Sequence, residues 1–229
     1  MSTAEAGVTA EPRSRHRKGE GEQLRREILD ATRELLAEKG NLDLVSIRGI
    51  AARVGVTPPS IYLHFKDKDH LGYSVCREAF ESFGARLLPV LTGDGNAVDR
   101  LRRLGEEYVR WGLDNAALYP VLFIGGPPRS IEPEEMSGDP GLTILEGLVA
   151  LVRSGMDEGL ISTDHSPEAT AWALWAVAHG TVLLLISKME WVKEHLENVG
   201  AEITLPTAEA MIETAIDGLS RGFFEPATG

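Results

Sequence analysis

The most informative stretch of this sequence is SIRGIAARVGVTPPSIYLHF, residues 46–65. Its first half carries apolar residues at helical spacing: Ile47, Ile50, Ala51 and Val54. Ser46 precedes them and is a residue type that caps helix N-termini, whereas Gly55 interrupts the pattern. Thr57 followed by Pro58 is typical of the start of another helix. Two short helices joined around a glycine predict a helix-turn-helix, although a helical hairpin in a larger bundle would show the same pattern.

Helical patterns continue on both sides of this stretch. Upstream, a helix over residues 22–39 is predicted to end at Gly40. Downstream, Asp67 can cap a long helix that runs to about Leu88, ahead of Pro89. No β-patterned run is present, so we predict an all-α fold of about nine helices. The later helices are predicted over residues 97–115, 119–124, 141–159, 166–198 and 207–224.

Charge divides the chain into parts. The 229 residues have a formal net charge of −12. Residues 1–70 hold 12 Lys and Arg against 11 Asp and Glu, whereas the remainder holds 11 against 24. Residues 1–21 have no apolar periodicity and contain a basic cluster of Arg13, Arg15, Arg17 and Lys18. We therefore expect a disordered basic arm over residues 1–21, a first domain over 22–70 and an acidic second domain over 71–229, and local basic charge can still attract nucleic acid.

Several classes of protein are disfavoured. The single cysteine, Cys76, excludes a disulfide framework and a cysteine-rich zinc site. The chain shows no signal peptide, so we expect a cytoplasmic protein. Residues 169–186 contain no charged side chain and reach the lower limit for a membrane span, but His179 lies among them and no basic cluster flanks them. We therefore expect this helix to be buried on all sides, in a core or against a partner chain, with no membrane involved.

Enzymatic signatures are absent from the sequence. It contains no nucleophile elbow, Walker loop, dinucleotide-binding fingerprint or HExxH motif. No second histidine or carboxylate lies at ligand spacing around His179, so no metal site is expected there. We expect no catalytic residues, no cofactor and no metal.

The block of residues 24–71 resembles the DNA-binding domain of the tetracycline-repressor (TetR) family. The resemblance implies a transcriptional regulator, most often a repressor, that binds a pseudo-palindromic double-stranded DNA operator as a homodimer. It also implies release of the operator when a small molecule binds the C-terminal domain. The residues that match the family's motif in register are Ile50, Ala51, Gly55, Val56, Thr57, Ile61, Tyr62, His64, Phe65, Lys68 and Leu71.

DNA contacts follow from this resemblance. The second helix of the motif would enter the major groove, with Tyr62, His64 and Lys68 on phosphates. The family commonly carries polar residues or glycine where this chain has two prolines, which cannot hydrogen-bond to base edges. Base reading would then rest on Ser60 and Arg53, supplemented by DNA shape. Thr57 could bind a phosphate or only cap its helix, and Arg48 could bind a phosphate or only be solvated. The expected DNA-binding residues are Arg48, Thr57, Pro58, Pro59, Ser60, Tyr62, His64 and Lys68.

The acidic domain is implied to hold an apolar ligand cavity and the dimer interface. We expect the dimer to form through residues 166–198 and 207–224, with Ala169, Ala173, Leu184 and Ile216 as candidate contacts. The alternatives are that the large side chains only pack in the core, that the protein is an enzyme, or that it is an architectural DNA binder without ligand control. The expected ligand-binding residues are Tyr108, Trp111, Phe123, Trp172, Trp175 and His179, the last three of which share one helix face.

Overall fold

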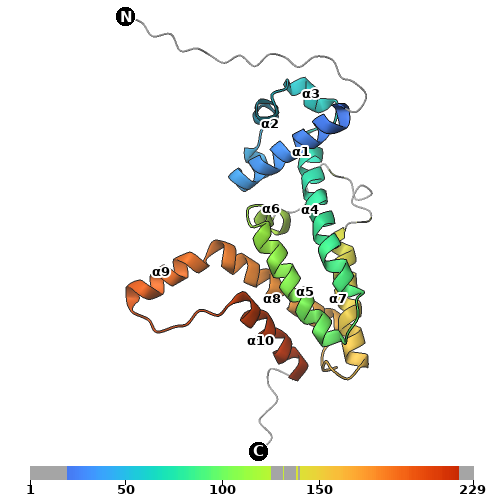
Figure 1. Cartoon of the computed structure of the whole chain (residues 1–229), viewed down its shortest axis with the longest axis vertical. Coiled ribbons are helices and arrows are strands. Elements are labelled where there is room, and N and C mark those ends of the chain that lie inside the picture. The colour runs from blue at the N-terminus through green and yellow to red at the C-terminus, as the bar shows by residue number, and fades with distance from the viewer. Residues whose placement is uncertain (1–19, 125–130, 132–137, 139, 222–229) are drawn as a thin grey trace, which may run out of the picture. The chain divides into compact units, whose positions relative to one another are not determined.

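Every regular element in the described part of the chain is helical, which confirms the predicted all-α fold (Figure 1). The computed structural model describes residues 20–124, 131, 138 and 140–221, so nearly all of the predicted basic arm lies outside the described residues. The chain forms two compact units. One comprises residues 1–76 and 120–135, and the other comprises residues 77–119 and 136–229.

The first unit is built on α1, Glu20–Lys39, which is followed by the 3-10 turn η1, Leu42–Leu44. Helices α2, Ile47–Val54, and α3, Pro58–Tyr62, come next, and α2 packs against both α1 and α3. The predicted helix after Thr57 therefore ends at Tyr62, before Phe65. The helices are held together by completely buried apolar side chains, among them Ile28, Leu36, Ile50, Ile61 and Leu71.

Helix α4, Lys68–Leu91, begins in the first unit and continues into the second. It contains Pro89, so the prediction that it stops before this proline was wrong. Proline removes a single backbone donor, and near a C-terminus little helix is left for it to disrupt. The last turn is retained, because the Thr92 N–H still donates to the Leu88 carbonyl at 3.1 Å.

Four helices make up the core of the second unit: α5, Ala97–Asp114, α7, Pro140–Asp157, α8, Pro167–Ser187, and α10, Ala208–Arg221. Helices α5 and α8 pack against each other, and both contact α7 and α10. Gly112 allows the close approach of α5 to α8, because a Cβ atom there would lie 2.7 Å from Val182 Cγ1. The short helix α6, Tyr119–Phe123, follows α5.

The predicted helix over residues 166–198 is interrupted. Helix α8 ends at Ser187, and α9, Met189–Val199, begins after Lys188, whose ψ is −21° and φ is −130°. This interruption gives ten α-helices in the described residues where nine were predicted.

Helix α8 is not buried on all sides within the single chain, so of the two expected alternatives only burial against a partner chain could cover it completely. It is long and apolar enough to cross a membrane by length and composition, yet it packs against α5, α7 and α10. Its buried side is formed by Thr170, Ala171, Thr181 and Val182. The opposite side is solvent-exposed in the single chain, and we call it the α8 face: Trp172, Ala173, Ala176, Val177 and Leu184.

Candidate DNA-binding surface and effector site

The turn between α2 and α3 has the geometry of a helix-turn-helix. Ser46 caps α2, since its Oγ accepts a hydrogen bond from the Gly49 N–H at 3.1 Å. Gly55 ends α2 with a φ of +78°, a left-handed conformation that favours glycine. Ile61 is the buried side chain of α3 and anchors this helix in the unit. The predicted motif is thus present, and the rest of α3 is left for outside contacts.

The outward side of α3 carries most of the predicted DNA-binding residues. Thr57, Pro59 and Tyr62 are exposed, whereas Pro58, Ser60 and His64 are half-buried. Tyr62 is 55% exposed, so more than half of its surface is available for contacts outside the unit. The Thr57 hydroxyl does not cap α3 but hydrogen-bonds to Ser60 Oγ at 3.0 Å.

Lys68 and Arg48 lie at the starts of α4 and α2. The Lys68 Nζ donates to the Leu42 carbonyl at 3.1 Å, which ties α4 to the η1 turn and leaves the ammonium half-buried. Arg48 is exposed on the first turn of α2. Backbone groups at the start of α4 are also satisfied locally, because Asp67 Oδ1 accepts from the His70 N–H at 2.9 Å and meets His70 Nδ1 at 2.9 Å. The His70 N–H lowers the pKa of Asp67.

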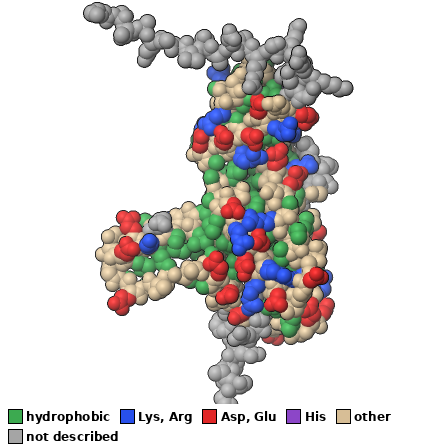
Figure 2. All heavy atoms as spheres, viewed as in Figure 1, with side chains coloured by type: hydrophobic (Ala, Val, Ile, Leu, Met, Phe, Trp, Pro, Cys, Tyr) green, Lys and Arg blue, Asp and Glu red, His purple; other side chains and the backbone are tan. Residues whose placement is uncertain are grey.

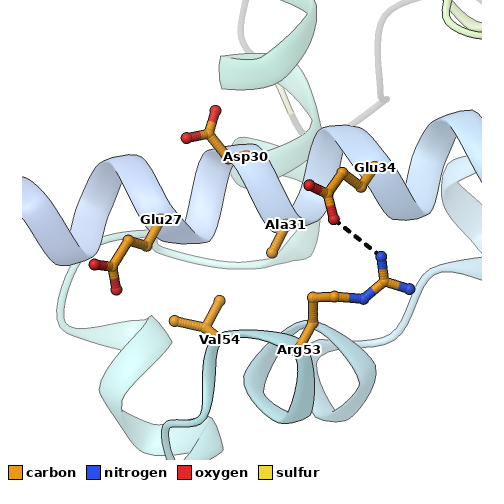
Figure 3. A pocket seen from close by; sticks show the side chains of 6 residues that line it. All are labelled: Glu27, Asp30, Ala31, Glu34, Arg53 and Val54. Carbon is orange, nitrogen blue, oxygen red and sulfur yellow. Dashed lines mark hydrogen bonds and ion pairs between the residues drawn. The ribbon is translucent and has the colours of Figure 1, made fainter.

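Arg53, which was expected to help to read bases, is ion-paired with helix α1. Its guanidinium forms an ion pair with Glu34 at 3.0 Å (Figure 3) and another with Glu38 at 2.9 Å, and both carboxylates are on α1. Arg53 and Glu34 border an open pocket of about 300 Å³ that Glu27 and Asp30 also line. Carboxylates on this side repel phosphate, so the pocket lies on a side of the unit unsuited to DNA.

The N-terminus of α1 lies beside the end of α3. A Cβ atom on Gly21 would be 3.9 Å from His64 Cε1. The Arg25 guanidinium lies 5.0 Å from the centre of the Phe65 ring, a cation–π contact. The first described turn of α1 therefore lies next to the predicted phosphate ligand His64.

A second group of polar side chains lies inside the other unit, where Tyr119 meets α5 and α8. The Tyr108 and Tyr119 hydroxyls are 2.8 Å apart, and the Tyr119 hydroxyl is 2.8 Å from His179 Nδ1. The indole N–H of Trp175 donates to the Tyr108 hydroxyl at 3.2 Å. We call these four residues the tyrosine–histidine cluster.

Chemistry fixes one donor of the cluster. Because Trp175 can only donate, the Tyr108 oxygen accepts from it. Either of the Tyr108 and Tyr119 hydroxyls can donate to the other, and His179 Nδ1, which also lies 3.4 Å from the Tyr108 hydroxyl, accepts or donates according to its tautomer. Burial lowers the pKa of His179, in agreement with the neutral form. Burial also raises the pKa of Tyr108 to about 12, so this hydroxyl keeps its proton.

Three of the predicted ligand-binding residues are not members of this cluster: Trp111, Trp172 and Phe123. Trp111 is buried against Phe83, with ring centres 4.8 Å apart, and Phe83 also contacts Tyr108 at 5.2 Å. Trp172 packs edge-on against Trp175 at 5.0 Å but is 51% exposed on the α8 face. Phe123 belongs to the first unit.

The predicted shared face of Trp172, Trp175 and His179 is confirmed, since Trp175 and His179 have ring centres 5.4 Å apart. Sequence reasoning did not select Tyr119 for this site. Tyr119 and His179 are 60 positions apart, and no local spacing relates them.

The cluster predicts how stability depends on pH. Since the pKa of His179 is lowered in the folded protein, the unfolded chain takes up this proton first as pH falls. The free energy of unfolding is therefore unaffected by this proton above about pH 6.5 and decreases as pH falls below that value. Denaturant unfolding at several pH values should show the decrease in wild type. His179→Gln keeps an acceptor but does not titrate, so its free energy of unfolding should decrease less over the same pH range. An equal dependence on pH in wild type and variant would contradict the assignment.

Two family models match the chain. Residues 28–72 match the bacterial regulatory proteins of the tetR family, and residues 101–199 match the tetracyclin repressor-like C-terminal domain. The chain belongs to the TetR family. The first match contains the whole helix-turn-helix, and the second contains all of the tyrosine–histidine cluster. This TetR-family chain is therefore a transcriptional regulator with a helix-turn-helix DNA-binding domain, in a family that is not one of enzymes.

Relatives of this TetR-family chain agree with that assignment. An HTH-type transcriptional repressor from Mycobacterium tuberculosis is 38% identical over 61 residues. The match covers 27% of this chain and 32% of that repressor, so it spans about a third of the relative.

Two solved structures share the fold. The regulator FadR from Bacillus subtilis, in complex with stearoyl-CoA, is 19% identical with a TM-score of 0.64 over 86% of this chain and 98% of FadR. AibR, in complex with isovaleryl coenzyme A and operator DNA, is 18% identical with the same TM-score and the same coverage.

Other chemistry finds little support in the described residues. They contain no group of three or more His, Cys, Asp or Glu side chains that could bind a metal ion. Burial raises the pKa of Cys76 to about 11, so this thiol is protonated at neutral pH.

Proposed function

We propose that the protein is a ligand-responsive repressor that acts in the cytoplasm. It binds a pseudo-palindromic operator as a homodimer and leaves it when a small, mainly apolar molecule binds the second unit. The observation that carries the DNA-binding part is the exposed side of α3, where Tyr62 and its neighbours stand outside a buried anchor at Ile61. The cytoplasmic location agrees with a DNA-binding role.

The tyrosine–histidine cluster supports the ligand-responsive part. Ligand sites in proteins are mostly apolar with a few convergent polar groups. Tyr108, Tyr119 and His179 are such groups, set among Phe83, Trp111 and Trp175. The complexes of AibR and FadR with coenzyme A thioesters make acyl-CoA compounds the first molecules to test.

The exposed α8 face supports the homodimer. It has no charged residue, and obligate two-fold interfaces are as apolar as a domain core. The predicted contacts Ala169, Ala173 and Leu184 are exposed, whereas the side chain of Ile216 lies outside the described residues. A monomeric mass at micromolar concentration in sedimentation would contradict the dimer.

Helix α4 offers a route from ligand to DNA. It starts at Lys68 in the first unit and reaches Phe83 beside the cluster in the second. Movement of α4 on ligand binding would change the spacing of the two recognition helices in the dimer. A coupling of about 1–3 kcal/mol changes operator affinity by about 5- to 150-fold.

The experiment that tests this function measures operator binding with and without ligand. Mobility shifts with the DNA that flanks the protein's own gene would identify the operator, and acyl-CoA compounds would then be added. We expect release of the DNA with the compound recovered unchanged. Consumption of the compound would favour an enzyme, and binding unaffected by every compound tested would favour an architectural DNA binder.

We expect His179→Ala to uncouple ligand from DNA. Loss of the imidazole removes the hydrogen-bond partner of Tyr119, so ligand-induced release should weaken by about fivefold or more while ligand-free operator binding is nearly unchanged. His165→Ala is the matched control, because His165 is exposed in the loop before α8. Equal loss of operator binding with and without ligand would mean that His179 is only structural.

A further inference from the structure

Helix α9 projects from the second unit (Figure 1). Among the described residues, α8 is the one helix with which it makes more than marginal contact. Gly200 ends α9 with a φ of +65°, and residues 201–207 lead the chain back to α10. We call residues 189–207 the α9 arm.

Large apolar side chains of the α9 arm are exposed. Trp191 and Val199 are each 60% exposed, and Ile203 is 64% exposed. Figure 2 shows hydrophobic side chains along this projection, with charged ones near its end. The Trp191 ring stacks on His195 with centres 5.1 Å apart and planes 9° apart, which orders the indole on the surface. Ordered exposed aromatic side chains are typical of binding surfaces.

The arm has little to stabilise it within one chain. An isolated helix of 11 residues is marginal in water, and helices in proteins gain most of their stability from packing an apolar face. Here more than half of the surface of each of these apolar side chains is left uncovered in the single chain. A covering surface would supply the missing stabilisation.

Charge and position indicate what covers the arm. The arm carries four Glu and one Lys, and this negative charge opposes binding to DNA or to an anionic membrane. It also lies next to the α8 face, since α9 follows α8 after the single residue Lys188 and packs against α8. A partner that covers the α8 face therefore also reaches the arm.

We propose that the α9 arm clasps a second copy of this chain. The proposal rests on the homodimer proposed above and adds a distinct contact, in which each protomer extends its arm over its partner beyond the α8 face. In a two-fold dimer each arm contacts the other protomer, so one substitution in the arm alters two contacts per dimer. The arm then sets the lifetime of the dimer, because interface changes act mainly on dissociation.

The test uses full-length protein and the rate of subunit exchange between dimers labelled with two fluorophores. Trp191→Ser combined with Val199→Ser removes the two large exposed apolar side chains of α9 itself. We expect exchange to accelerate by about tenfold or more, because a truncated hot-spot residue costs a factor of this size. Lys193→Ser combined with Glu197→Ser is the matched control, since both residues are exposed on the same helix, and it should exchange at the wild-type rate. Far-UV circular dichroism checks the helix content of all variants.

Photo-crosslinking gives a second readout. A benzophenone amino acid at position 199, in a mixture of isotopically heavy and light protein, should yield peptides crosslinked between heavy and light chains. Crosslinks within one chain only, or wild-type exchange in the arm variant, would overturn the arm proposal. The α8 variant Leu184→Glu separates the two proposals. If Leu184→Glu dissociates the dimer while the arm variant exchanges at the wild-type rate, the homodimer proposal holds and the arm proposal fails. A monomeric wild type would overturn both.

Discussion

Tyr62→Phe and Lys68→Ala are each expected to weaken binding to every DNA sequence by about tenfold or more. The tyrosine change removes one hydroxyl donor from an exposed ring, and the lysine change removes one positive charge at the start of α4. A dimer loses each contact twice. Since each phosphate contact contributes roughly 0.9 to the slope of log affinity against log salt, the magnitude of the slope should fall by about 2 for Lys68→Ala.

The measurement is operator affinity by fluorescence anisotropy at several salt concentrations, for a specific and an unrelated duplex. Lys193→Ala is the control for charge, because it removes the same charge from an exposed site on α9 in the other unit. Thermal unfolding is needed alongside, since Lys68 also donates to the Leu42 carbonyl. A change in base preference with an unchanged salt dependence would show that these residues read bases and do not contact phosphates.

Ile61→Ala is expected to lower the free energy of unfolding of the first unit by about 2–5 kcal/mol. Ile61 is completely buried, and it is the buried side chain through which the five-residue α3 is anchored. Its truncation removes apolar burial and leaves a cavity that short helices cannot easily close. Operator binding should be lost with it, because an unanchored α3 no longer presents Tyr62 in a fixed position.

Denaturant unfolding of the full-length variant, followed by circular dichroism, measures this effect. Leu63→Ala is the control for stability, because Leu63 lies two positions away and is 79% exposed. It should change the free energy of unfolding by less than about 0.5 kcal/mol. A loss equal to that of Ile61→Ala would mean that burial in this small unit does not determine its stability.

Local sequence was sufficient for most of the helices and for the helix-turn-helix. Ser46, Asn96 and Ser166 were each followed by a helix, and each side chain accepts a hydrogen bond from the backbone N–H three residues later. Capping needs only a short polar side chain next to free backbone donors, so it is visible in a few residues. The α8–α9 interruption was missed because the apolar pattern continues through Lys188.

Tertiary structure alone decided which of the predicted residues come together. Arg53 could have faced DNA or α1, and only the packing of α2 on α1 places it on Glu34 and Glu38. Tyr119 joined the site because the packing of α5 and α8 brings it to His179.

Most of the helices could be predicted from the sequence, because capping, helical periodicity and turn residues act over a few positions. The tyrosine–histidine cluster and the exposed α8 face depend on contacts between residues many tens of positions apart. Periodicity shows that a helix has apolar sides but not which neighbour covers each of them. Tertiary packing determines which neighbour covers each side. In the single chain this packing leaves one side of α8 and one side of α9 exposed.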